Sequence, residues 1–94
     1  MVKVVAMNKV MEDKITTVIE LYEELVLETR KETGCITYEL YQDEKEAAVL
    51  TIIEEWEDKD ALDKHMKSEH FQRIVPMVGK YVVENALNIY HKVY

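Results

Sequence analysis

The stretch from residue 32 to residue 42, Glu-Thr-Gly-Cys-Ile-Thr-Tyr-Glu-Leu-Tyr-Gln, combines a helix stop with the start of a strand. Gly34 suits the left-handed backbone that ends many helices, and Arg30 and Lys31 suit the negative end of a helix dipole. Residues 35–42 are typical of a β-strand. The stretch therefore predicts a helix before Gly34 and a strand after it.

On either side of this stretch the pattern continues with regular elements. Valine-rich residues 2–10 predict a first strand, and residues 15–26 carry apolar side chains at three- and four-residue spacing, as on one face of a helix. The polar residues 43–46 indicate a turn, and residues 48–56 predict a strand that forms a hairpin with the one before it.

The last forty residues predict a broken helical region and a final strand. Asp58 and Ser68 can each cap a helix, Pro76 is expected to kink or end the second of these helices, and Gly79 closes it. Residues 84–94 predict the last strand. The order β-α-β-β-α-β predicts one α+β domain over residues 1–94, a sandwich of ferredoxin-like topology.

The predicted strands are apolar on both faces. Val4 and Ala6 share one face of the first strand, while Val5 and Met7 are apolar on the other. Helices can cover only one of these faces, and the chain has no spare element for the second. We therefore expect a homodimer in which a second copy covers the open face.

Composition excludes several classes of partner. The net charge is −7, and no basic stripe is present for a phosphate backbone, so neither nucleic acid nor a membrane is an expected partner. The single cysteine, Cys35, excludes an internal disulfide framework and suits a reducing compartment. No signal peptide or spanning segment is visible, so a cytoplasmic location is expected.

Two blocks of sequence resemble the antibiotic biosynthesis monooxygenase family. The first is Glu32-Thr33-Gly34-Cys35-Ile36-Thr37-Tyr38-Glu39-Leu40, and the second joins Glu55-Trp56, Ala61-Leu62 and His65 to Ser68, His70 and Phe71. The resemblance implies a dimeric α+β barrel with a pocket in each subunit between sheet and helices. It also implies an activity, because members of this family include cofactor-independent oxygenases of quinols and polyphenols, haem-degrading enzymes and an isomerase of a phosphorylated dione.

We interpret the chain as a cofactor-independent monooxygenase that acts on a small quinol- or polyphenol-type aromatic substrate with dioxygen. Two alternatives remain at this point. One is an isomerase of a small, phosphorylated dione-type carbonyl compound, and a basic pocket rim would favour it. The other is a non-catalytic module that binds small molecules or is associated with stress, and a closed, filled pocket would favour it.

Six residues are candidates for the site. His65 and His70 are the expected base or hydrogen-bond donors, because imidazole titrates near neutral pH, and Asn8 places an amide on an otherwise apolar strand face. We expect these three residues to act catalytically. The expected substrate-binding residues are Trp56, Tyr38 and Phe71, and His65 is expected to line one pocket with Asn8 and Trp56. Each candidate also has a purely structural interpretation, such as core packing or backbone hydrogen bonding.

No cofactor and no metal are expected. The chain has no glycine-rich phosphate loop or dinucleotide fingerprint, and His65 and His70 lack the spacing of a helical metal pair. In the haem-degrading branch that the resemblance includes, a histidine ligates the iron at the position of Val75, and valine cannot do so. Haem degradation is therefore disfavoured.

Overall fold

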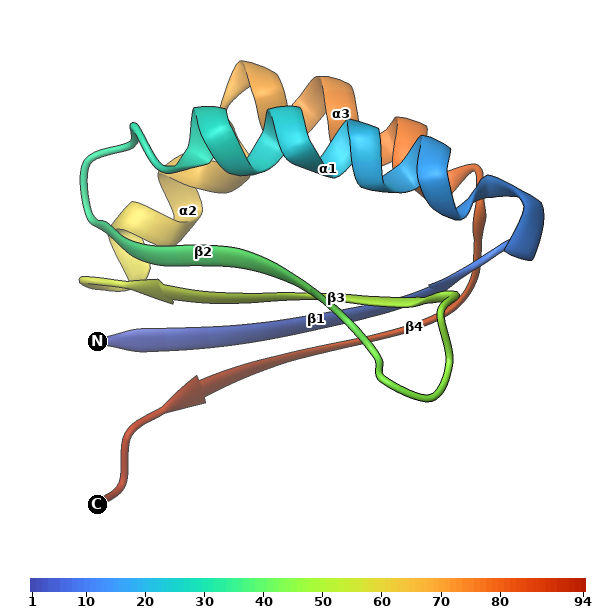
Figure 1. Cartoon of the computed structure of the whole chain (residues 1–94). Coiled ribbons are helices and arrows are strands. Elements are labelled where there is room, and N and C mark those ends of the chain that lie inside the picture. The colour runs from blue at the N-terminus through green and yellow to red at the C-terminus, as the bar shows by residue number, and fades with distance from the viewer.

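A computed structural model describes residues 1–94 as a four-stranded antiparallel sheet covered on one face by helices (Figure 1). The strand order is β2-β3-β1-β4, so the first strand lies in the middle of the sheet. The elements are β1 (Val2–Val10), the 3₁₀ turn η1 (Glu12–Lys14), α1 (Ile15–Thr29), β2 (Cys35–Gln42), β3 (Val49–Trp56), α2 (Lys59–Met66), α3 (Glu69–Gly79) and β4 (Val82–His91). The predicted ferredoxin-like α+β fold is confirmed.

The core lies between the sheet and the helices. Alternate residues of β3 are buried there, namely Leu50, Ile52, Glu54 and Trp56. They meet the apolar faces of the helices above, among them Leu25 of α1. A glutamate in this row is unusual, because carboxylates are rarely buried without a charged partner.

The opposite face of the sheet carries no covering element in the chain (Figure 1). Val5 and Met7 of β1 lie opposite Ile53 and Thr51 of β3, and all four side chains are half-buried. Towards the sheet edges this face carries exposed aromatic rings, such as Tyr41 of β2. Both faces of the sheet thus carry apolar residues at their centre, as the sequence predicted, and charged residues such as Lys3 and Glu55 surround those on the uncovered face.

Local signals place most of the helix ends. The Asp58 side chain accepts a hydrogen bond from the Ala61 amide, and Ser68 Oγ accepts one from the Phe71 amide, so the predicted caps of α2 and α3 are present. Gly34 has a φ of 88°, the left-handed value expected between α1 and β2.

Two expectations at the C-terminal end were wrong. Pro76 was expected to kink or end α3, and it does not end the helix, which continues to Gly79. An interior proline removes one backbone hydrogen bond, and Gln72 and Pro76 are exposed, so water can replace that bond. The last strand runs over Val82–His91, whereas residues 84–94 were expected. It therefore begins two residues earlier and ends three residues earlier than predicted. Pairing with β1, which local sequence does not reveal, sets these bounds.

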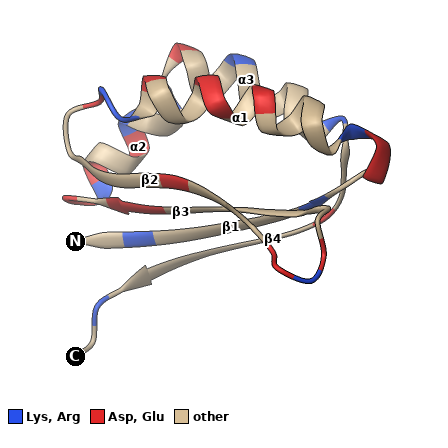
Figure 2. Cartoon of the chain, in the orientation of Figure 1, with Lys and Arg blue, Asp and Glu red and all other residues tan.

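Charged side chains lie mainly outside the core. Figure 2 shows acidic residues on α1 and on the turn between β2 and β3, with basic residues scattered among them. None of the helices is both long enough and apolar enough to cross a membrane.

Candidate functional site

A cavity of about 170 Å³ lies between the sheet and the helices, beside α3 and β4. Its wall is mostly apolar, with a few polar groups. The lining residues are Ala6, Met7, Asn8, Tyr22, Leu25, Tyr38, Ile52, Glu54, Phe71, Val75, Asn85, Ala86 and Leu87. An apolar cavity with a few polar groups is the usual form of a small-molecule site.

Glu54 is the only carboxylate on this wall, and no Lys, Arg or His lines the cavity. Its side chain is 5% exposed, and Trp56 Nε1 donates a hydrogen bond of 2.7 Å to its Oε1 atom. Burial raises the pKa of Glu54 from the usual 4.5 to about 7, although the Trp56 hydrogen bond opposes the rise and the nearby Glu32 charge adds to it. Glu54 can therefore exchange a proton near neutral pH.

Asn8 and two tyrosines supply the neutral polar groups of the wall. Asn8 Nδ2 donates a 2.7 Å hydrogen bond to the Tyr22 hydroxyl oxygen, which leaves the Tyr22 proton available to another acceptor. Burial raises the pKa of Tyr22 to about 12 and moves the pKa of Tyr38 well above its ordinary value. Both hydroxyls therefore stay protonated and can donate hydrogen bonds.

His65 lies behind this wall, in the aromatic core. Its side chain is 1% exposed, and its ring centroid lies 4.7 Å from that of Trp56, 5.3 Å from that of Tyr38 and 5.0 Å from that of Phe71. Burial lowers the pKa of His65, and this outweighs the opposite effect of its hydrogen bond to Glu32. We therefore assign His65 as a neutral ring at neutral pH.

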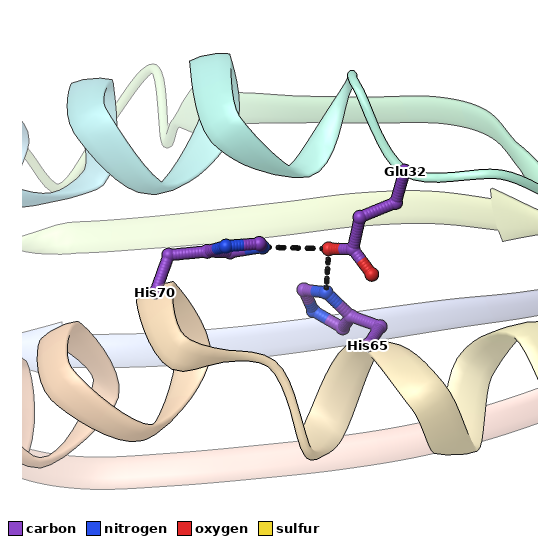
Figure 3. Close-up of side chains that lie close together, drawn as sticks. All are labelled: Glu32, His65 and His70. Atoms are coloured by element: carbon purple, nitrogen blue, oxygen red, sulfur yellow. Dashed lines mark hydrogen bonds and ion pairs between the residues drawn. The ribbon is translucent and has the colours of Figure 1, made fainter.

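Glu32 joins the two histidines (Figure 3). Its Oε2 atom lies 2.7 Å from His65 Nδ1 and 2.7 Å from His70 Nε2. The three side chains come from the turn after α1, from α2 and from the start of α3. This carboxylate therefore fastens the helical layer together at one end of the sheet.

The same three residues form a donor set that a divalent cation could use, since their ligand atoms lie within 4.8 Å of one another. A metal on His65 Nδ1 would force the ring proton onto Nε2. That atom is buried and has no hydrogen-bond partner, whereas a metal-bound histidine normally donates its second N–H. The cluster therefore fits a hydrogen-bonded node better than a metal site.

The structure divides the six predicted site residues into two groups. Asn8, Tyr38 and Phe71 line the cavity. His65 and Trp56 do not line it, so the expectation that they share a pocket wall with Asn8 is wrong. Both side chains are buried, Trp56 is hydrogen-bonded to Glu54, and His65 packs against Tyr38 and Phe71. His70 also lies off the cavity, in its bond to Glu32.

Sequence reasoning missed Glu54, Tyr22 and Glu32. Glu54 alternates with apolar residues on the buried face of β3, and this alternation is a signal that could have found it. Glu32 gives no such signal, because its partners lie 33 and 38 residues further along the chain.

Comparison with known proteins identifies the family of the chain and supports its fold. The family model described as antibiotic biosynthesis monooxygenase matches residues 1–77. An uncharacterised protein from Synechocystis is 38% identical over 73 residues, which are 77% of this chain and 50% of that protein. The chain thus spans about half the length of this curated relative.

Two solved structures resemble the chain over nearly its full length. A conserved protein from Methanosarcina mazei Go1 is 40% identical with a TM-score of 0.95, and the match covers 98% of this chain and 92% of that one. The crystal structure of an antibiotic biosynthesis monooxygenase is 37% identical with a TM-score of 0.95, and covers 100% of both chains. The chain belongs to the antibiotic biosynthesis monooxygenase family.

Proposed function

We propose that the protein is a monooxygenase that oxidises a small quinol- or polyphenol-type aromatic molecule without a cofactor. The observation that carries this proposal is the cavity, which joins apolar walls to Asn8, Tyr22, Tyr38 and Glu54. Aromatic rings fit the apolar part, and the polar groups can hold the ring oxygens. Phe71 adds an aromatic face for stacking.

The proposed reaction begins with loss of a hydroxyl proton from the substrate to a base. The electron pair that remains makes the ring electron-rich, so that it reduces dioxygen directly and forms a carbon–oxygen bond. Cleavage of the resulting O–O bond places one oxygen atom in the product as a carbonyl or hydroxyl, and the other leaves as water with two substrate hydrogens. All four electrons come from the substrate.

Two features favour this function over the alternatives. A phosphorylated dione would need cationic groups, and no Lys or Arg lines the cavity. A non-catalytic module with a filled core would have no cavity at all, whereas this one leaves about 170 Å³. His65 and His70 are proposed to support the site from behind, since they hold Tyr38 and Phe71 in place through ring contacts and the bond to Glu32.

A second copy of the chain is the proposed partner. The uncovered face bears Val5, Met7 and Ile53, and Tyr41 of β2 and Tyr90 of β4 are exposed on the same face. Apolar side chains gathered on a sheet face that no element covers commonly mark an interaction surface. A two-fold pairing through this face would cover it in both copies.

The direct test measures dioxygen uptake by the purified protein with a panel of quinols and hydroxyanthrones. We expect uptake that depends on protein and substrate, with one atom of ¹⁸O₂ in the product and one in water. Val75→Phe should reduce uptake about tenfold or more, because the larger ring fills the cavity that Val75 lines. Met77→Phe, at an exposed position of the same helix, is the control. Uptake equal in both variants would exclude this cavity as the site.

A further inference from the structure

We infer that Glu54 is the proton acceptor of this site, that Trp56 positions it, and that the ligand is an uncharged hydroxyarene. The inference rests on the proposed function and adds to it a named base and a substrate charge. It starts from the placement of the carboxylate. Glu54 lies in the row of β3 side chains that face the helices, and it is the only acidic group on the cavity wall.

The Trp56 hydrogen bond fixes how Glu54 is presented. Trp56 is fully buried, and its Nε1–H donates to Oε1, so one carboxylate oxygen is held by the core. Oε2 remains for a ligand in the cavity. A substrate O–H that breaks there leaves its electron pair on the substrate oxygen and passes its proton to Oε2, and the proton can leave again with the water that the reaction forms.

The groups around Glu54 determine when it is ionised. Tyr38 from β2 and Tyr22 from α1 are neutral donors on the cavity wall. His65 from α2 packs on Trp56. Glu32, in the turn after α1, adds a negative charge at longer range. The lining residues from β1, α3 and β4 are uncharged. Without any cation on the wall, ionised Glu54 repels anions and accepts a hydrogen bond from a neutral hydroxyl.

The neutral donors suggest how the rest of the ligand is held. The Tyr22 hydroxyl, fixed by Asn8, can donate to a second oxygen of the ligand, such as a carbonyl or a second hydroxyl. The cavity volume of about 170 Å³ is below the range of drug-sized pockets, which begins near ~300 Å³. The site therefore suits a small hydroxyarene in preference to an extended polyphenol.

The first arm of the test uses a ligand that does not react. Binding of 1-naphthol and of 1-methoxynaphthalene is measured by calorimetry at pH 8, and the indole N–H resonance of Trp56, the only tryptophan, is followed by NMR. We expect 1-naphthol to bind about tenfold more tightly or better, because only it can donate to the carboxylate. The Trp56 resonance should titrate near neutral pH in the wild-type protein.

The matched variants are Glu54→Gln and Glu57→Gln, since Glu57 is exposed just beyond β3. Glu54→Gln should abolish the titration and reduce the preference for 1-naphthol to less than about threefold, and Glu57→Gln should change neither. Equal binding of the two ligands by the wild type, no binding at all, or a preference that survives Glu54→Gln would overturn the inference.

The second arm separates the inference from the proposed function. Dioxygen uptake with 1,4-naphthalenediol should fall about 10²-fold or more in Glu54→Gln. Uptake that persists in this variant refutes Glu54 as the base and leaves the monooxygenase. Selective binding of 1-naphthol through Glu54 without any uptake refutes the monooxygenase and leaves the hydroxyarene site. If Glu54→Gln does not fold, Trp56→Phe serves instead, and an unchanged pH profile of uptake in that variant overturns the inference.

Discussion

Trp56 Nε1 donates a 2.7 Å hydrogen bond to Glu54 Oε1, and the two side chains lie two residues apart on the buried face of β3. This pair puts a titratable carboxylate in the core with only one neutral donor to stabilise its charge. Burial without a cation is costly for an ionised group, so this pair lowers the stability of the fold wherever Glu54 is ionised.

Glu54→Gln should make the protein more stable above pH 7. The pKa of Glu54 is about 7 in the folded chain and near 4.5 when unfolded, so the folded chain binds more protons between these values. Its contribution to stability is present at low pH and is lost as pH rises towards 7, with a total of about 3 kcal/mol. Urea unfolding at pH 8 should show a gain of roughly 1–3 kcal/mol for Glu54→Gln.

The same measurement on Glu57→Gln provides the control, because that carboxylate is exposed and no gain is expected. A loss of stability in Glu54→Gln at pH 8 would mean that the carboxylate is ionised at little cost, and that its environment is more polar than the structure indicates.

Trp56→Phe should shift the pH profile of dioxygen uptake upwards. The indole N–H stabilises ionised Glu54, so its removal lets burial raise the pKa of Glu54 further. Uptake limited by the ionised base should then reach half its maximum at a higher pH than in the wild type. Phenylalanine keeps most of the ring packing, and a change in rate alone, without a shift of the midpoint, would mean that Trp56 acts only by packing.

His65→Gln should destabilise the fold and reduce its sensitivity to acid. The buried ring bonds Glu32, and loss of such a bond costs about 1–3 kcal/mol. Burial lowers the pKa of His65, so as pH falls below the ordinary value of 6.5 the unfolded chain takes up a proton that the folded chain resists, and stability is lost. Thermal unfolding between pH 4.5 and 7.5 measures both effects.

His91→Gln, at an exposed position near the end of β4, is the control and should leave both stability and its pH dependence unchanged. Equal behaviour of the two variants would contradict the assignment of His65 as a buried neutral ring.

Val5→Asp and Met7→Asp should each dissociate or unfold the proposed dimer, because they place a charge in the face that a second copy would cover. Sedimentation equilibrium at micromolar concentration measures the mass. Leu27→Asp, on the exposed side of α1, should leave the dimer intact. A wild-type mass near 11.1 kDa would exclude the pairing, and a Val5→Asp protein that stays dimeric and equally stable would place the contact elsewhere.

The sequence by itself determined the order of elements and most of their ends. The signals that revealed them are local properties of the chain. They are the alternation of side chains in strands, the three- and four-residue spacing in helices, the caps Asp58 and Ser68, and the glycine at a left-handed turn. They act over a few residues, so they can be recognised from a single sequence. The limits of β4 are the exception, since pairing with β1 sets them.

Only the tertiary structure decided which side chains meet. Residues that repeat on one strand face can be predicted to be buried, and Asn8, Tyr38 and Phe71 do line the cavity. Which aromatic ring reaches the cavity depends on how the helices cross the sheet. Tyr38 and Phe71 line the cavity, and His65 packs against both rings without lining it. Glu32 contacts His65 and His70, which lie more than thirty residues further along the chain. The pKa of Glu54 is raised by burial, and this burial exists only once the helices pack on the sheet. Contact and desolvation are properties of the folded structure, so the sequence alone does not reveal them.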